Sequence, residues 1–204
     1  AYGKQVAAGV GRAAAGAGAV LISGGAAGID GAAHEGCLDG GGVTAAVLGT
    51  GVDIFYPGGH EDLFRRILDN GGALVSEYPF GTPPRKWNFP ERNRIIAGMA
   101  DRLVVVEAPH RSGAMSTARH ALEAGKEVWA VPGRITEECC GGSNRLIFDG
   151  AHPLVSISEF AALAFNRQLS LFPEEEKRKK TPFYTEKEQK ILSVLKKHGE
   201  RTVD

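Results

Sequence analysis

Short apolar runs alternate with longer segments of helical periodicity along most of this chain. Runs rich in valine, leucine and alanine predict β-strands at residues 19–23, 44–49, 72–77, 102–108 and 127–133. Amphipathic patterns predict helices at about residues 3–16, 30–39, 60–70, 91–100, 114–124, 143–149 and 157–167. Near-continuous apolar strands separated by helices are typical of a parallel sheet covered on both faces. The pattern therefore predicts an α/β fold with a doubly wound, mostly parallel Rossmann-like sheet.

The pattern changes in the last fifth of the chain. The charged, proline-containing segment at residues 169–182 predicts a solvated linker. Beyond it, apolar residues such as Ile191 and Leu195 fall on one face of a further predicted helix. We therefore expect one domain at residues 1–168, followed by the linker and a short C-terminal helical tail within residues 183–204.

Composition and charge limit the classes of protein to which this chain can belong. Lys+Arg and Asp+Glu number 24 each, so any binding of nucleic acid requires a local basic patch. No run of about 18 apolar residues and no signal-peptide pattern occurs, so no membrane span is expected. The three cysteines, Cys37, Cys139 and Cys140, match neither a disulfide framework nor a zinc spacing. They are expected to be reduced thiols, and no metal is expected.

The stretch "SGGAAGIDGAAHEGC" places glycines between a predicted strand and a predicted helix. Such a turn exposes unpaired backbone N–H groups, so Ser23, Gly24 and Gly25 are candidates for holding a phosphate. The glycine spacing departs from the dinucleotide-binding fingerprint, and a turn without any ligand is the alternative. Asp30 and His34 lie one helical turn apart. We expect Asp30 to cap or charge the helix start and His34 to pack, rather than the two to form a general-base pair.

A second strand–turn–helix junction occurs in "HRSGAMSTARHALEAG". Small hydroxyl groups and free N–H groups at Ser112, Gly113 and Ser116 suit phosphate oxygens. The alternative is simple helix capping by Ser112 or Ser116. Because the carboxyl ends of parallel strands meet at one edge of a sheet, both junctions are expected at that edge.

The stretch "TPPRKWNFPERNRIIAG" interleaves basic and aromatic residues. Four cations accompany two aromatic rings, namely Arg85, Lys86, Arg92 and Arg94 with Trp87 and Phe89. Single-stranded nucleic acid needs this combination, because charge neutralises phosphate and a flat ring stacks on an unpaired base. The alternative is a surface loop whose aromatic side chains fill the core.

The segment "PGGHE" after the second predicted strand raises a rival, enzymatic interpretation. Phosphoribohydrolases that cleave nucleotides on a related sheet carry Pro-Gly-Gly-x-Gly-Thr-x-x-Glu, whereas here His60 and Glu61 follow the glycines directly. We interpret the segment as a loop that enters the helix starting near His60. A nucleotide-binding, phosphoribohydrolase-like enzyme is the alternative function, and a module that mainly contacts another protein is a third.

Several stretches together resemble the DNA-processing protein DprA/Smf family. They are "SGGAAGIDGAAH", "AVLGTGVDIFYP", "SEYP", "FPERNRIIAG", "SGAMSTARHALEAGKEVWAVPG" and "SNRLIFDGA", in that order, within about residues 2–167. The resemblance implies a bacterial, cytoplasmic protein that binds single-stranded DNA and helps to load the RecA recombinase in natural transformation and recombination. It implies no catalysis, no cofactor and no metal.

The resemblance also implies roles for individual residues. Lys86 and Phe89 fall on positions that contact the DNA strand in the family. The glycine turn Ser23–Gly25 and the helix start Ser112–Ser116 fall on the walls of the same pocket. Its floor corresponds to a motif matched by Arg92, Asn93 and Arg94.

The family pairs as a homodimer through its Rossmann domain. The resemblance places that interface near Leu146, Ile147 and Val155. The family's first strand, which ends in an arginine that contacts DNA, is absent from this sequence, so we expect the sheet to lack a central element. Residues 183–204 resemble the opening of the family's C-terminal winged-helix module.

Overall fold

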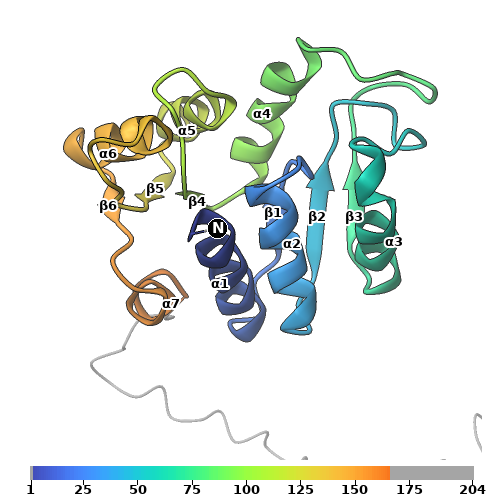
Figure 1. Ribbon diagram of the computed structural model, residues 1–204. Coiled ribbons are helices and arrows are strands. Elements are labelled where there is room, and N and C mark those ends of the chain that lie inside the picture. The colour runs from blue at the N-terminus through green and yellow to red at the C-terminus, as the bar shows by residue number, and fades with distance from the viewer. Residues whose placement is uncertain (1, 166–204) are drawn as a thin grey trace, which may run out of the picture. The chain divides into compact units, whose positions relative to one another are not determined.

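The computed structural model of the protein describes residues 2–165, and Figure 1 shows its ribbon. The first half consists of α1 (Tyr2–Gly16), β1 (Leu21–Ser23), α2 (Ile29–Asp39), β2 (Thr44–Val47), the 3-10 turn η1 (Gly58–His60), α3 (Glu61–Asp69) and β3 (Ala73–Val75). The second half consists of α4 (Asn88–Met99), β4 (Arg102–Val105), α5 (Gly113–Glu123), β5 (Glu127–Ala130), η2 (Glu138–Cys140), α6 (Gly141–Phe148), β6 (His152–Pro153) and α7 (Ile157–Phe165). The predicted linker and helical tail lie outside the described residues.

The described strands all pair in parallel, in two sheets of three. One sheet has the order β1-β2-β3, with Ile22 opposite Ala45. The other has the order β4-β5-β6, with Val104 opposite Trp129. The predicted α/β fold with parallel strands is therefore confirmed, but the strands form two sheets where the sequence predicted one.

The break between the sheets coincides with a cavity of about 720 Å³ that β1 and β4 both border. Among the described residues, β1 pairs with β2 alone and β4 with β5 alone. Each strand therefore has a free edge, whose backbone groups lack ladder partners. Apolar side chains contribute much of the cavity lining, among them Val10, Ile96 and Leu103.

The predicted elements agree with the structure to within a few residues, with two informative differences. Helix α4 begins at Asn88, three residues before the predicted start, because Pro90 is tolerated in a first helical turn whose N–H groups have no helical acceptor. Strand β6 was not predicted, since two residues ending in Pro153 show neither alternation nor an apolar run.

Helices and strands enclose several small apolar clusters instead of one large core. Phe64 and Ile67 of α3 pack against Ala46 and Leu48 beside β2. Trp129 of β5 packs with α1 and with Phe160 of α7, at 5.3 Å between the two ring centres. These clusters fix the strands whose carboxyl ends carry the predicted site.

Helices α1 and α2 lie in close contact because two glycines face the partner helix. A Cβ atom on Gly11 would overlap the backbone at Ala33, and one on Gly36 would overlap Ala8. The close packing places the start of α2, and with it the glycine turn after β1, in a fixed position. No helix within residues 2–165 is long and apolar enough to cross a membrane.

Candidate nucleic-acid interface

Three turns meet at the carboxyl ends of the strands. Each contains a predicted site residue or lies next to one. The turn Ser23–Gly25 follows β1, the turn Gly49–Gly51 follows β2, and the loop 106–112 leads from β4 into α5. Helix α4 lies at the same edge, at the top of the view in Figure 1. This arrangement confirms that the two strand–turn–helix junctions share one edge of the fold.

Three buried polar side chains of α4 each hold one of these turns. Asn88 Nδ2 donates a hydrogen bond to the carbonyl of Gly49 at 2.8 Å. Arg92 donates from a terminal nitrogen to the carbonyl of Gly24 at 2.8 Å. Asn93 Nδ2 donates to the carbonyl of Gly113 at 3.0 Å.

Asn88, Arg92 and Asn93 are only 2%, 4% and 7% exposed, respectively. Arg92 and Asn93 therefore lie beneath the edge, and their role as the floor of a DNA pocket stays a prediction. Their hydrogen bonds are made within the protein, so their structural contribution is to fix the turns relative to one another. Asn88 was not among the predicted residues, because the sequence interpretation started α4 after it.

Arg92 places a positive charge directly under the glycine turn. Its guanidinium packs against Gly24 so closely that a Cβ atom there would lie 2.6 Å from a terminal nitrogen. Burial lowers the pKa of Arg92, and the nearby charge of Asp30 opposes that effect. The Nε atom of Arg92 has no hydrogen-bond partner among the described residues. A partly uncompensated buried cation favours the approach of an anion to this edge.

An aromatic pair lies above the floor. The ring of Phe89 covers Gly49, where a Cβ atom would lie 2.9 Å from the ring. The ring of Tyr56 is 5.6 Å from that of Phe89, centre to centre, at an angle of 40°. Phe89 is half-buried and Tyr56 is 46% exposed. Sequence analysis did not single out Tyr56; its signal was an aromatic residue in the turn that follows β2.

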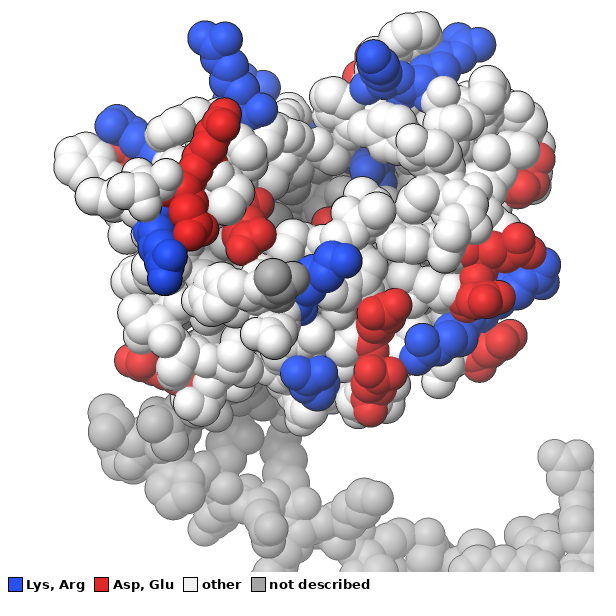
Figure 2. Space-filling model, viewed as in Figure 1, with Lys and Arg blue, Asp and Glu red and all other residues white. Residues whose placement is uncertain are grey.

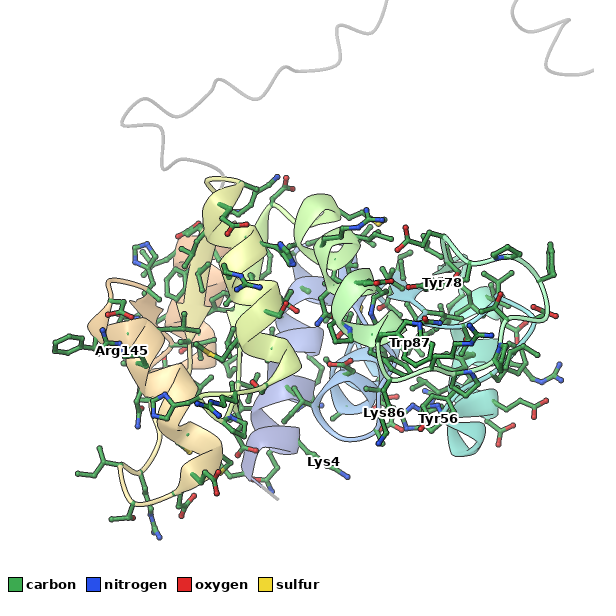
Figure 3. The ribbon with its side chains drawn as sticks, turned by 90° about the horizontal axis from the view of Figure 1, so that it is seen from above. Lys4, Tyr56, Tyr78, Lys86, Trp87 and Arg145 are labelled. Carbon is green, nitrogen blue, oxygen red and sulfur yellow. The ribbon has the colours of Figure 1, made fainter. Side chains whose placement is uncertain are left out.

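Lys86 and Trp87 project from the chain just before α4. Both are exposed, Trp87 to 60%, so Trp87 does not fill the core. Arg85 lies over the Trp87 ring, 5.7 Å from its centre. Viewed from above, Lys86 and Trp87 lie in the same region of the edge as Tyr56, whereas Arg145 lies well apart (Figure 3). Charge and flat rings are thus combined at one place.

Arg94 differs from its neighbours in the predicted set. It pairs with Glu77, and its side chain is 57% exposed. The ion pair neutralises its charge at the surface instead of leaving it for a phosphate. Arg94 therefore supplies less free positive charge to the edge than Lys86, which forms no salt bridge within residues 2–165.

The two helix N-termini differ as anion sites. At α2, Asp30 lies in the first turn and its Oδ2 accepts from the Ala26 N–H at 3.2 Å, so a carboxylate already occupies this position. At α5, Ser112 caps the helix by accepting from the Met115 N–H at 3.4 Å, and the first turn contains no acidic residue. The N–H groups of Gly113 and Ala114 precede any helical acceptor. The α5 end is therefore the more favourable place for a phosphate.

Ser23, Gly24 and Gly25 form the predicted glycine turn, but their exposure is uneven. Both glycines are buried, Gly24 under Arg92 and Gly25 against the Phe64 ring, while Ser23 is half-buried. Ser116 is also half-buried in the first turns of α5. Ser23, Gly24, Phe89, Arg92, Asn93 and Gly113 all line the cavity between the two sheets. Six of the predicted residues therefore share one hollow, whereas Gly25, Lys86, Arg94, Ser112 and Ser116 do not line it.

His34 packs inside the fold, as expected. Thr44 Oγ1 donates to the carbonyl of Leu21 at 2.8 Å, so this oxygen accepts at 2.7 Å from Nδ1–H of His34. Nε2 of His34 is then the unprotonated nitrogen, and it has no partner in the described part of the chain. Burial lowers the pKa of His34 from 6.5 to about 4. Neutral His34 supports the sheet beneath the turn instead of acting as a base.

The segment "PGGHE" forms a loop that enters α3, as the sequence interpretation stated. His60 Nδ1 lies 3.0 Å from the carbonyl of Gly25 and braces the glycine turn. Glu61 pairs with Arg65 one turn along α3, on the exposed surface. Within residues 2–165 no carboxylate is hydrogen-bonded to Ser23, Gly24 or Gly25; Asp30 bonds the N–H of the next residue, Ala26.

The three predicted dimer residues lie in different environments. Leu146 is 6% exposed and packs against Val105 and Ala130, so it offers almost no surface to a partner. Ile147 is half-buried against the same cluster, whereas Val155 is 65% exposed. Phe148, which the sequence analysis did not name, is 80% exposed beside Ile147.

Figure 2 shows where charge gathers on one face of the molecule. Lysine and arginine side chains project on both sides of a hollow in the upper part of this face. A second hollow of about 490 Å³ lies on the other side of α4 and is lined by Tyr78, Phe80, Arg85 and Trp87 among others. Acidic side chains also border the upper hollow on its left in Figure 2, so the face carries charges of both signs.

Comparison with known proteins agrees with this architecture. Residues 1–164 match the model of a family described as DNA recombination-mediator protein A. The chain is similar to Protein Smf of Escherichia coli, with 46% identity over 154 residues, which cover 76% of this chain and 40% of that protein. This chain therefore spans less than half of the length of that relative.

Two solved structures are similar to the fold. The X-ray structure of DNA processing protein A from Streptococcus pneumoniae has a TM-score of 0.71 and 39% identity, covering 80% of this chain and 56% of that one. A structure of DNA processing protein A from Helicobacter pylori, reported for its single-stranded DNA binding mode, has a TM-score of 0.72 and 32% identity, covering 80% and 74%. From its sequence and its fold, this chain belongs to the DNA recombination-mediator protein A family, which includes the DprA and Smf proteins.

Proposed function

We propose that this chain binds single-stranded DNA along the carboxyl edge of its strands, without catalysing a reaction. One observation carries the proposal: α4 presents Phe89 against Tyr56, three residues after the exposed Lys86, while its buried side chains lock the surrounding turns. Such an arrangement gives an unpaired base a rigid aromatic surface and gives its phosphates nearby positive charge.

The positions at this edge that can bind anions suggest a path for the DNA strand. A base would stack on Phe89, with Tyr56 extending the aromatic surface. One neighbouring phosphate would lie near Lys86, and another near the N–H groups at the start of α5. Arg92 would attract the strand from below without touching it, because its side chain is almost entirely buried.

The rival enzymatic function fits the site less well. A phosphoribohydrolase needs a carboxylate aimed at the ribose, but Glu61 points to Arg65 on the surface. Asp30 is already bonded to the Ala26 N–H, and His34 is buried with its Nδ1 proton donated to Thr44. Release of free base from AMP or other nucleoside monophosphates would nevertheless identify such an enzyme directly.

The wider role that we propose is the loading of RecA onto single-stranded DNA during natural transformation and recombination, by a homodimer. Membership of the recombination-mediator family supports this role. The single-stranded DNA binding mode reported for the Helicobacter pylori relative supports the ligand. For the dimer, Val155 and Phe148 are exposed apolar side chains of the kind that an interface covers.

The stacking role of Phe89 can be tested with substitutions at that one position. Phe89→Leu keeps an apolar side chain over Gly49 but removes the flat ring, so it should lower affinity for oligo-dT by roughly tenfold or more, as expected for a lost base stack. Phe89→Tyr, which keeps a flat ring over Gly49, is the matched control and should leave affinity nearly unchanged. Fluorescence anisotropy measures binding, and circular dichroism checks the fold. Equal affinities of wild type and folded Phe89→Leu would refute the stacking role.

A further inference from the structure

Two adjacent cysteines lie in the loop that follows β5. Cys139 and Cys140 end the short turn η2, and their Sγ atoms are 3.8 Å apart. Oε2 of Glu137 lies 4.0 Å from Sγ of Cys139. One donor atom from each of these three residues lies within 4.8 Å of the other two. Spacing along the sequence gave no sign of this cluster, because one of the three donors is a carboxylate and the cysteines are consecutive.

The separations match those around one tetrahedral zinc ion. Two thiolates bound to Zn²⁺ at about 2.3 Å lie about 3.8 Å apart when the angle between them is tetrahedral. A thiolate and a carboxylate oxygen at about 2.1 Å lie about 3.6 Å apart in the same geometry. The sulfur pair already has the required spacing, and the carboxylate needs only a small rotation of the exposed Glu137 side chain.

The loop holds the thiols in place by contacts that do not involve a metal. The Cys140 N–H donates to the carbonyl of Glu137 at 3.0 Å, and Ser143 Oγ donates to the carbonyl of Cys140 at 3.1 Å. Gly133 lies against the Cys140 thiol, where any side chain on Gly133 would collide with it. Asn144 bonds both the N–H and the carbonyl of Gly133 at 3.0 Å. The donors are therefore preorganised, which reduces the entropy lost on binding an ion.

The electrostatic surroundings favour a cation. Glu107 adds a further negative charge near the three donors. Among the described salt bridges, the one that involves a proposed ligand joins Arg134 to Glu137 at 3.6 Å. The Arg134 side chain is 84% exposed, so solvent screens its positive charge. A bound metal ion stabilises the thiolate form of cysteine, so the thiols release their protons on binding.

The imidazole of His110 lies near the cluster but has to rotate toward it to complete the coordination, because no ring nitrogen of His110 is within 4.8 Å of all three donors. Nε2 of His110 would be 2.7 Å from a Cβ atom on Gly141, the residue that directly follows Cys140. His110 is exposed and belongs to the loop between β4 and α5. Zn²⁺ commonly combines Cys, His and carboxylate ligands.

We propose that Glu137, Cys139 and Cys140 bind one Zn²⁺ ion, with His110 as its fourth ligand. The ion joins the loop after β5 to the loop that ends at Ser112. It thereby fixes the N-terminus of α5, which borders the nucleic-acid interface. The site itself is independent of whether that interface binds DNA.

Cobalt substitution tests the site on the whole chain. The protein is reduced, stripped of metal with a chelator and titrated with Co²⁺, whose complexes with thiolates absorb in the near ultraviolet and whose tetrahedral complexes absorb strongly in the visible. We expect saturation at one Co²⁺ per chain and loss of both bands when Zn²⁺ displaces Co²⁺. Proton release on binding should accompany the change, because the thiols lose their protons.

Single substitutions assign the ligands. Cys139→Ser, at the less buried cysteine, should weaken Co²⁺ and Zn²⁺ binding by more than about tenfold. Removing a group that only orients a metal ligand already costs about tenfold or more in affinity, and removing the ligand itself should cost more. His110→Asn should also weaken it and lower the visible absorption. Cys37→Ser, at the buried cysteine of another cluster, is the matched control and should bind like wild type. Absence of a thiolate band, or an unchanged band in Cys139→Ser, would overturn the proposed site; unchanged binding by His110→Asn would overturn the fourth ligand.

Discussion

The buried histidine under the glycine turn predicts how stability depends on pH. His34 is fully buried, donates from Nδ1 to Thr44, and has no acceptor for a proton on Nε2 within the described residues. Among the charged and titratable groups near it, Asp30 favours protonation, whereas His60 and Arg92 oppose it. Acid must therefore place an unpaired charge in the core, and the folded state should lose stability as His34 becomes protonated.

The magnitude follows from the pKa values of the two states. A fall from 6.5 to about 4 corresponds to about 3 kcal/mol, at about 1.4 kcal/mol for each pKa unit. Because the folded pKa lies below the unfolded one, this contribution is complete above pH 6.5 and decreases as the pH falls toward 4. Between pH 7 and pH 4.5, His34 alone should cost the folded state about 2 kcal/mol.

Urea unfolding followed by circular dichroism measures this effect. His34→Asn keeps an N–H donor near the position of Nδ1 and does not titrate, so its free energy of unfolding should fall by about 2 kcal/mol less than that of wild type between pH 7 and pH 4.5. His152→Asn, at an exposed histidine, should keep the steep dependence of wild type. If wild type and His34→Asn lose stability in parallel over this pH range, the account of His34 is wrong.

Three further predictions concern DNA binding and the dimer interface. Gly49→Ala should displace the Phe89 ring and weaken binding of single-stranded DNA several-fold, whereas Gly58→Ala, where a Cβ atom meets open space, should bind like wild type in the same anisotropy assay. Lys86→Ala should weaken binding and reduce the slope of log affinity against log salt by about 0.7, the value for one phosphate contact on a single strand; an unaltered slope would place Lys86 away from the DNA. Val155→Glu should shift the chain from dimer to monomer in sedimentation velocity, while Leu122→Glu on α5 should not; an unmoved profile for Val155→Glu would remove this residue from the interface.

Much of the fold could be predicted because its signals are local. Apolar strand runs and amphipathic helices repeat along the chain, and each predicted strand is present at a shorter length. The packing of His34 and the placement of Asp30 at the start of α2 could also be predicted, since capping and burial depend on near neighbours. The start of α4 was predicted three residues too late, because its first turn contains Pro90, which that position of a helix tolerates.

The site could be predicted only in part, because burial and pairing depend on residues far apart in the chain. Sequence placed Arg92, Asn93 and Arg94 together, but the structure separates two buried floor residues from one surface ion pair with Glu77. Tyr56 joins Phe89 across more than thirty residues, and Asn88 reaches Gly49 across a similar distance. The size and lining of the cavity between the two sheets also arise from long-range packing, which no local pattern encodes.

The most direct test of the central claim is a competition experiment by fluorescence anisotropy. Labelled oligo-dT is bound to the chain at two salt concentrations, and unlabelled single-stranded DNA, duplex DNA and AMP are added as competitors. The account predicts salt-sensitive binding that single strands displace and that AMP and duplex DNA displace poorly. Absence of binding by the folded chain, or displacement by AMP as effective as that by single strands, would contradict it.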